Sequence, residues 1–296
     1  MAAADIRHWT IGDVTISRIV EVGGFADNIS MLFAGADAEW LKQYTWLEPH
    51  FMTPDGRMII SFHAFLLRTP TRRIMIDTCI GNDRQRPYDV FNNLATTFLA
   101  DLATAGCPAD TIDTVLCTHL HFDHVGWNTQ RVNGRWVPSF PNARYLFARK
   151  EWVHTKKLID DQDPHYAHYA DCIEPILNAG LADFVETDHR LCDEVWLEPT
   201  HGHTAGHVSV RIRSCGKDAV ITGDLMHHPV QCCVPERHGN FDADPVMAAK
   251  TRREFLARYE DRRALVLGSH FADPTAGWFV RHADAWRFQL LDEESR

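Results

Sequence analysis

The chain has 296 residues, an apolar content of 45%, a charged content of 24% and a net charge of −10. This length and composition suit a soluble globular protein with a substantial buried core. The negative charge, without a clear basic patch, disfavours nucleic acid as a partner, and no run of about 18 apolar residues suggests a membrane span.

The first predicted elements are strands. Residues 9–22 alternate apolar and polar side chains around a Gly-Asp pair, which predicts a hairpin. Two strand-like runs follow at 58–69 and 72–78, joined by a turn that contains proline. Apolar residues at helical spacing then predict a helix over 91–105.

Residues 25–57 show no regular period but are rich in large apolar side chains. These are Phe25, Met31, Leu32, Phe33, Trp40, Trp46 and Phe51. So much apolar surface in an irregular segment predicts that it covers a pocket or meets a second subunit. The second possibility would make the protein a homodimer.

The rest of the chain mixes strands and helices in two halves. We predict strands at 114–119 and 143–148, a helix over 151–179 broken near Asp163-Pro164, strands near 194–198, 207–213 and 219–223, a helix over 244–259, and a last buried strand at 264–270. No low-complexity linker divides the chain, so residues 1–296 are expected to form one domain. Strands interspersed with helices predict an α/β fold in which two sheets are sandwiched between helices.

Four segments share one pattern, a short apolar strand followed by a turn that carries His or Asp. They are residues 114–124, 197–207, 219–228 and 264–271. Rigid strand ends can direct several loops at one point, and imidazole and carboxylate groups are ligands of zinc. The pattern therefore predicts a metal centre assembled from all four segments.

The first of these segments contains more candidate ligands than one ion needs. In an extended turn, residues two apart point the same way, so His119 and His121 can hold one ion. Asp123 and His124 then face a different direction. Their placement suggests a second ion.

These segments resemble the sequence motifs of the metallo-β-lactamase superfamily. HLHFDH at 119–124 matches the HxHxDH signature, THGHTAGH at 200–207 resembles TPGHTPGH, TGD at 222–224 resembles the bridging-aspartate motif, and GSH at 268–270 resembles the terminal histidine motif. The motifs follow the family's order, and the resemblance covers roughly residues 10–285. It implies the αββα sandwich of that family.

The resemblance also implies two sets of metal ligands and one shared residue. These are His119, His121 and His203 for the first ion, Asp123, His124 and His270 for the second, and Asp224 as the bridge, with a water or hydroxide as the other bridge. We expect two divalent ions per chain, most simply Zn²⁺, although the ligand set also accepts Fe or Mn.

Other residues near the motifs are assigned supporting roles. His207 matches a frequent family histidine that is not a ligand, and we expect it to pack behind the site. Asp77 is expected to accept a ring N–H and fix the tautomer of a ligand. His201 replaces the family's usual proline and is expected to be a non-ligand, and His63 is expected to be a core histidine.

The predicted reaction is hydrolysis. A metal-bridging hydroxide would attack a C=O or P=O centre while Asp123 orients it and carries a proton to the leaving group. The bridging Asp224 disfavours the β-lactamases proper, and the chain most resembles quorum-quenching lactonases and methyl parathion hydrolase-like enzymes. Longer members of these groups carry an apolar N-terminal segment that lines the pocket and forms the dimer; residues 25–57 resemble it, so the resemblance implies a homodimer. The expected activity opens a lactone or cleaves a hydrophobic carboxylic ester; an organophosphate triester or phosphodiester is the alternative substrate, and a non-catalytic ligand-binding member of the fold is a third possibility.

The expected substrate contacts come from one histidine and three aromatic residues. His227 stands where the best-known acyl-homoserine lactonases have a tyrosine, three residues after the bridging aspartate, and it could donate a hydrogen bond to the developing oxyanion. Phe122, Trp127 and Phe271 are expected to line an apolar substrate pocket. The N-terminus shows no secretory signal and the eight cysteines form no CxxC pair, so we expect a cytoplasmic protein with reduced thiols.

Overall fold

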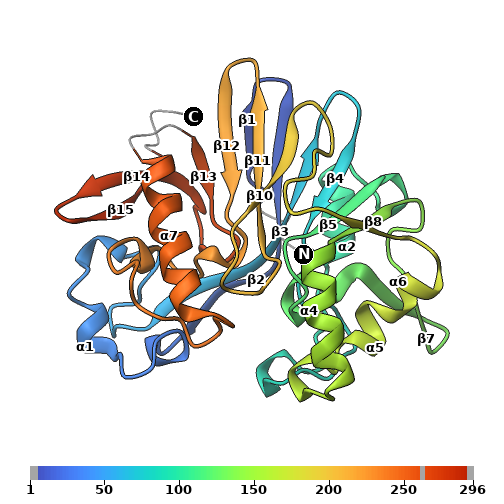
Figure 1. The fold of residues 1–296 in the computed structure, drawn as a ribbon, viewed down its shortest axis with the longest axis horizontal. Coiled ribbons are helices and arrows are strands. Elements are labelled where there is room, and N and C mark those ends of the chain that lie inside the picture. The colour runs from blue at the N-terminus through green and yellow to red at the C-terminus, as the bar shows by residue number, and fades with distance from the viewer. Residues whose placement is uncertain (1–5, 261–263, 292–296) are drawn as a thin grey trace.

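A computed structural model describes residues 6–260 and 264–291 of the chain (Figure 1). Two β-sheets lie face to face, and helices cover the outer face of each sheet. The predicted αββα sandwich is confirmed.

The first sheet has seven strands and is built from the N-terminal half. Its order is β1 (His8–Ile11), β2 (Val14–Asp27), β3 (Met58–Arg68), β4 (Arg73–Ile76), β5 (Thr114–Cys117), β8 (Arg144–Ala148) and β9 (Ala182–Val185). The strands from β1 to β4 are antiparallel, and those from β4 to β9 are parallel. The predicted N-terminal hairpin is confirmed as β1 and β2.

The second sheet has six strands in sequential order. They are β10 (Val195–Pro199), β11 (Val208–Ser214), β12 (Lys217–Ile221), β13 (Leu265–Leu267), β14 (Ala276–His282) and β15 (Ala285–Leu290). Only the β12–β13 pair is parallel in this sheet. Two short strands, β6 (Thr129–Val132) and β7 (Arg135–Pro138), form a separate hairpin that the sequence patterns did not predict.

Two helices, α4 (Arg149–Asp160) and α7 (Pro245–Tyr259), have 12 and 15 residues. The other helices are shorter and are α1 (Ala38–Leu41), α2 (Phe98–Thr104), α3 (Phe122–Val125), α5 (Tyr169–Cys172) and α6 (Glu174–Asn178). Asp244 caps α7 by accepting the backbone N–H of Met247 at 2.9 Å, and Pro245 occupies the first turn, where it costs no hydrogen bond. Within the described part of the chain, no helix is both long and apolar enough to cross a bilayer.

The core lies in three layers that follow from this arrangement. Between the sheets, Leu67 and Leu116 of the first sheet share one buried cluster with Val210 and Ile221 of the second. Outside the first sheet, α2 and α6 bury apolar side chains, and outside the second sheet α7 does the same. Because β3 is covered on both faces, its residues are apolar almost without interruption.

The irregular segment 25–57 packs onto the second sheet of its own chain. Ile29, Phe33 and Phe51 are fully or almost fully buried in the cluster that also contains Phe271 and Phe288. Its large apolar side chains are therefore largely satisfied within one chain. The proposed interface with a second copy stays a prediction.

The helix predicted over 91–105 is too long. Only Phe98–Thr104 is α-helical, after a short 3₁₀ turn at Asp89–Phe91. The Asn92 side chain accepts the backbone N–H of Arg86 at 2.6 Å, and Asn93 has a φ of 51°. Asparagine side chains that bond to nearby backbone compete with helix in this way.

Of two further predictions about element boundaries, one is confirmed and one is wrong. The predicted break near Asp163-Pro164 is confirmed, because α4 ends at Asp160 and a 3₁₀ turn begins at Pro164. The segment 264–270 is not the last buried strand, because β14 and β15 continue the sheet beyond β13. β14 and β15 form a hairpin at the edge of the sheet. Their side chains alternate between a more buried and a more exposed face.

The packing between the sheets gives a direct test of the sandwich. Leu116 is fully buried on β5, facing the second sheet. Leu116→Ala leaves a cavity there and is expected to lower the free energy of unfolding by about 2–5 kcal/mol in urea denaturation. The control Val153→Ala, on the 65% exposed side chain of Val153 in α4, is expected to change it by about 0.5 kcal/mol or less. Equal effects would contradict the assigned layers.

Candidate metal centre

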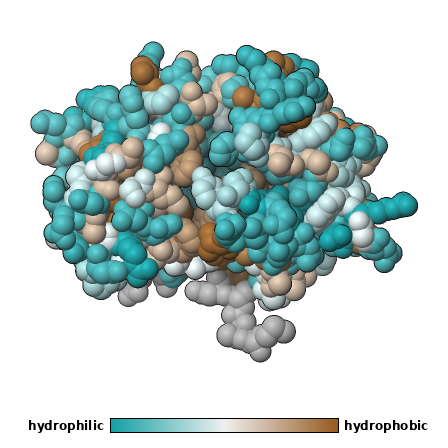
Figure 2. Space-filling view, turned by 90° about the horizontal axis from the view of Figure 1, so that it is seen from below, coloured by the Kyte–Doolittle hydropathy of each residue, from teal (hydrophilic) through white to brown (hydrophobic). Residues whose placement is uncertain are grey.

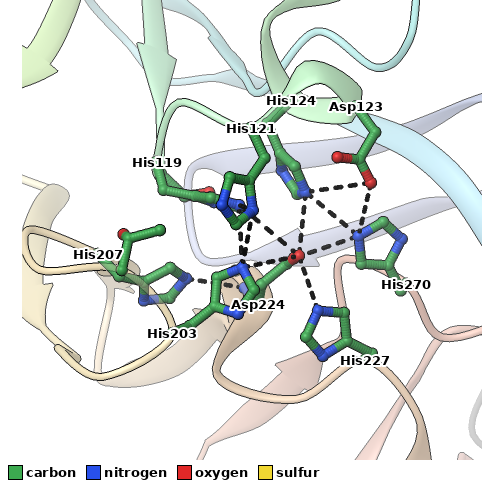
Figure 3. A network of polar contacts seen from close by, with 12 residues as sticks. His119, His121, Asp123, His124, His203, His207, Asp224, His227 and His270 are labelled. Atoms are coloured by element: carbon green, nitrogen blue, oxygen red, sulfur yellow. Dashed lines mark hydrogen bonds and ion pairs between the residues drawn. The ribbon is translucent and has the colours of Figure 1, made fainter. Parts of the chain in front are cut away.

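Side chains from the four predicted segments point toward one another at one site (Figure 3). The first sheet contributes the turn after β5 and helix α3, and the second contributes the loops after β10, β12 and β13. The residues brought together are His119, His121, Asp123, His124, His203, His207, Asp224, His227 and His270. Because β4 runs parallel to β5 and β12 runs parallel to β13, their carboxyl ends deliver these loops to a common edge.

Three imidazole nitrogens form the first cluster. His121 Nδ1 lies 3.0 Å from His119 Nε2 and 3.1 Å from His203 Nε2, and the latter two atoms are 3.3 Å apart. Nitrogen ligands 2.0–2.1 Å from a tetrahedral zinc ion lie roughly 3.3 Å from one another. The triangle therefore has the size that a zinc ion requires.

The far side of two of these rings is fixed by hydrogen bonds. His203 Nδ1 lies 3.3 Å from Asp242 Oδ1. Thr118 Oγ1 donates to Asp77 and so accepts from His119 Nδ1 at 3.1 Å. With their protons directed outward, the Nε2 lone pairs face one another, an arrangement that a cation stabilises. Burial also lowers the pKa of His119 and His121 well below the usual range, which favours the neutral form that binds metals.

The second cluster adds one carboxylate to two imidazoles. His124 Nε2 and His270 Nε2 are 3.2 Å apart, and Asp123 Oδ2 lies 3.8 and 3.5 Å from them. The opposite nitrogens are again engaged, because His124 Nδ1 bonds to Asp77 at 2.9 Å and His270 Nδ1 donates to the carbonyl of Ser61 at 3.1 Å. Asp123, His124 and His270 thus form a second group that could hold an ion.

Asp224 lies between the two clusters. Its Oδ2 is 3.7 Å from His119 Nε2 and 3.6 Å from His203 Nε2 on one side, and 3.2 Å from His124 Nε2 on the other. Its Oδ1 is 3.2 Å from His270 Nε2. Burial favours the neutral acid, but the surrounding imidazoles hold the pKa of Asp224 well below its usual range. Asp224 is therefore within reach of both clusters, as expected of the predicted bridging residue.

Asp77 joins the metal site to the end of strand β4. Besides His124, it accepts the backbone N–H of Thr118 at 2.7 Å, and its side chain is buried. Its φ of 58° is a strained backbone conformation for a residue other than glycine, and such strain persists where surrounding contacts enforce it. Asp77 therefore has the geometry of the predicted positioning role.

Three other histidines that the sequence predicts to be non-ligands belong to neither cluster; His207 contacts the site, whereas His201 and His63 occupy no ligand position among the described residues. His207 accepts the backbone N–H of Asp224 at 2.8 Å and donates to the carbonyl of Thr200 at 3.0 Å, so it supports the site from behind. Burial lowers its pKa to about 3. His201 belongs to none of the ligand clusters found among the described residues, and His63 lies in the core within 3.0–3.1 Å of Ser61 Oγ and the carbonyl of Gly268.

His227 lies in the site, close to the shared carboxylate. Its Nε2 is 3.1 Å from Asp224 Oδ2, and its ring stacks on His270 with centroids 5.6 Å apart. Its Nδ1 is buried and has no hydrogen-bond partner within the described chain. Burial lowers the pKa of His227, so the ring tends to stay neutral.

The three aromatic residues expected in a substrate pocket differ in position. Phe122 is partly exposed and lies 6.1 Å, between ring centroids, from Phe91. Trp127 stacks on Phe98 and donates to Glu21, and Phe271 is fully buried against Phe51. These packed positions make Trp127 and Phe271 core residues, so of the three only Phe122 is kept as a proposed substrate contact.

Two buried acidic residues at the site were missed by the sequence patterns. Asp242 contacts both His203 and the fully buried Arg252, each at 3.3 Å. Although burial opposes ionisation, these partners lower the pKa of Asp242 to about 2. Glu151 contacts both loops that carry the first cluster. Neither residue lies in a metal motif, so only proximity in the fold reveals its role.

Comparison with known sequences agrees with the resemblance. A profile described as the metallo-beta-lactamase superfamily matches residues 63–270. An N-acyl homoserine lactonase of a Bacillus species is 25% identical over 179 residues, and AiiA, an N-acyl homoserine lactonase of Bacillus thuringiensis subsp. kurstaki, is 24% identical over 181 residues. Each match covers 55% of this chain and 62% of the relative, so it spans less than two thirds of the relative's length.

Solved structures share the whole fold at low identity. AbOPH, a hydrolase in the beta-lactamase superfamily, has a TM-score of 0.79 and 23% identity over 99% of this chain and 100% of its own. AidC, a dizinc quorum-quenching lactonase in complex with the product N-hexanoyl-L-homoserine, has a TM-score of 0.79 and 22% identity over 97% of each chain. At these identities the likeness establishes the fold alone.

The contacts of Asp77 predict its effect on metal binding. Asp77→Asn would place an amide N–H₂ against a donor and is expected to weaken metal affinity roughly 10- to 100-fold, measured by competition with a chelator. Asp113→Asn is a matched control, because Asp113 also accepts one backbone N–H and one threonine hydroxyl, but at the opposite end of β5. If both variants bind metal as the parent does, the positioning role of Asp77 is wrong.

Proposed function

Because the chain belongs to the metallo-beta-lactamase superfamily, we propose that it is a dinuclear metal-dependent hydrolase that opens a lactone or cleaves a hydrophobic carboxylic ester. The observation that carries this proposal is the position of Asp224 between two ligand clusters. The imidazole and carboxylate donors suit Zn²⁺, and they also accept Fe or Mn. The names of the lactonase relatives support the choice of a lactone.

Two bound divalent ions would lower the pKa of water toward neutrality and polarise the substrate carbonyl. Around them, the protein would control the protons. Asp123 lies at the edge of the second cluster, with its side chain 14% exposed, so it can reach both the site and the substrate. We assign it the transfer of a proton from the nucleophile to the leaving group.

His227 is proposed to contact the substrate. Its Nδ1 is buried without a partner inside the described structure, and a buried polar atom left unpaired is costly. A substrate group on the side of the ring that faces away from Asp224 could pair with Nδ1 and so orient the substrate carbonyl. The residue would thus serve where the related lactonases use a tyrosine.

A continuous array of aromatic rings supports an apolar substrate. Phe62 lies 5.2 Å from the His270 ring and 4.9 Å from Phe91, which lies 6.1 Å from Phe122. Tyr88 extends the array, 6.1 Å from Phe122, and is 38% exposed. The rings therefore run from the second cluster to the surface. An acyl or aryl group attached to the scissile carbonyl would bury its apolar surface against the accessible end of this array, at Phe122 and Tyr88.

The molecular surface, seen from below, supports an apolar entrance to the site. Figure 2 shows hydrophobic side chains gathered in a hollow in the middle of this face, with hydrophilic side chains on either side. A small hydrophobic molecule is therefore the proposed partner. A phosphotriester or phosphodiester would fit the same two-cluster chemistry and is the alternative that a substrate panel must separate.

Metal content and a substrate panel test the proposal together. Protein purified without chelator is expected to carry about two divalent ions per chain, and it should hydrolyse acyl-homoserine lactones or aryl esters faster than phosphotriesters. Asp224→Ala removes the shared carboxylate and is expected to lose metal and activity together. The control Asp218→Ala alters a carboxylate on β12 that pairs with Arg213 away from the site, and it should retain both.

Each outcome of that experiment decides one part of the proposal. Less than about one ion per chain would contradict a dinuclear centre. Two ions with cleavage of phosphotriesters but of no lactone or ester would replace the lead substrate class with the alternative. Two ions with no hydrolysis of any class would favour the non-catalytic ligand-binding member of the fold. Full activity in Asp224→Ala would contradict the bridging role.

Removal of the carboxylate charge at position 123 tests proton transfer. Asp123→Asn keeps the size of the side chain but not its basicity, so kcat is expected to fall by about 10²–10⁴. The metal content should be measured beside the rate, because Asp123 is also a proposed ligand. A fall in kcat explained entirely by lost metal would contradict the proton-transfer role, and exposed Asp110→Asn serves as the neutral control.

A further inference from the structure

Glu151 is a buried carboxylate outside the proposed ligand clusters. It lies in the first turn of α4, and only 1% of its surface is exposed. Its Oε1 accepts the backbone N–H of Leu120 at 3.2 Å. Its Oε2 accepts the backbone N–H of Gly206 at 2.9 Å and the hydroxyl of Thr204 at 2.6 Å.

These partners belong to the two loops that supply the first metal cluster. Leu120 stands between His119 and His121 in the turn after β5 of the first sheet. Thr204 follows His203 in the loop between β10 and β11 of the second sheet. One side chain therefore ties together loops from two different sheets.

The close approach of the second loop to α4 depends on a glycine. A Cβ atom at Gly206 would lie 2.1 Å from the backbone nitrogen of Glu151, a separation that real atoms do not adopt. The loop can therefore rest directly on the first turn of α4. This approach is what brings the N–H of Gly206 to the carboxylate.

The peptide of Leu120 is held from its other side as well. His168 Nε2 donates to the carbonyl of Leu120 at 2.9 Å, and His168 is buried. Both polar groups of this residue are thus fixed by side chains of the segment that follows β8. The two histidines that flank Leu120 inherit that fixed position.

We propose that Glu151 is a positioning residue that sets the spacing of His119, His121 and His203. The inference rests on the proposed function in that the first cluster binds a metal ion. Three nitrogens from two independent loops lie within 3.0–3.3 Å of one another. Without the carboxylate, the N–H groups of Leu120 and Gly206 lose their shared acceptor, and the two loops separate. The metal affinity then falls, because the three nitrogens no longer keep their geometry.

The chemistry of the contacts explains why a carboxylate is required. Each oxygen of Glu151 faces a backbone N–H donor. A glutamine offers only one oxygen, so its N–H₂ group would oppose either Leu120 or Gly206. Glu151→Gln therefore keeps the side-chain volume but breaks one of the two links.

Glu21 provides a matched control. It is a largely buried glutamate that accepts the backbone N–H groups of Ile80 and Gly81, the indole N–H of Trp127 and the hydroxyl of Thr96. Trp127 lies in the segment between β5 and β6 but beyond α3, and no partner lies in residues 118–121 or 200–207, which carry the first cluster. Glu21→Gln therefore perturbs a comparable hydrogen-bond network without touching that cluster.

The experiment isolates the first cluster in a His270→Ala background, which removes a ligand of the second. Zinc affinity is measured by competition with a chromogenic chelator, and the visible spectrum of bound Co²⁺ reports the ligand geometry. Glu151→Gln is expected to weaken zinc binding about tenfold or more and to change the Co²⁺ spectrum. Glu21→Gln should stay within about twofold of the parent, the size of effect expected for groups outside the ligand network.

A milder variant covers the case in which Glu151→Gln does not fold. Thr204→Val removes one donor and leaves both backbone links, so a smaller loss of zinc affinity with the same direction of spectral change is expected. Equal affinity and spectra in the parent, Thr204→Val and any folded Glu151→Gln would overturn the positioning role while leaving the metal centre intact. If the wild-type protein, in which His270 is present, binds no zinc, the proposed function itself is wrong.

Discussion

The buried carboxylate of Asp224 is the constraint on which the site depends. Its Oδ2 lies within 3.1–3.7 Å of nitrogens from His119, His124, His203 and His227. An ionised carboxylate can be buried only with compensating charge and hydrogen bonds. The surrounding imidazoles offset part of the burial penalty, and two cations between these rings and the carboxylate would offset it more fully. The arrangement of the ligands thus follows from the need to neutralise one buried anion.

The fold meets that need by bringing two sheets together. Each sheet ends in loops with part of the ligand set, so neither sheet contains a complete site. Leu67 and Leu116 pack against Val210 and Ile221 and hold the sheets in one relative position, while Glu151 joins the loops at the edge. Hydrophobic packing thus holds the two sheets together, and the hydrogen bonds of Glu151 link the loops at their common edge.

Local sequence patterns predicted many of the helices and strands, and they failed at positions where tertiary contacts determine the structure. The hairpin around Gly12 and the capped helix after Asp244 follow from turn and cap chemistry. The helix predicted from residue 91 was shortened because Asn92 bonds to Arg86 instead of continuing a helical turn. Trp127 was expected beside a substrate, yet it stacks on Phe98 in the core, because an aromatic residue near a motif can face either way.

The sequence by itself determined which residue types gather at the site, because the histidine and aspartate spacings in four strand-end segments are local and readable. It also determined the family to which these motifs point. Only the tertiary structure decided that Asp242 contacts His203, that Glu151 contacts the loops of the first cluster, and that His227 faces Asp224. The physical reason is that each of those contacts joins segments far apart in the chain or depends on how a turn is oriented, and no local period encodes either.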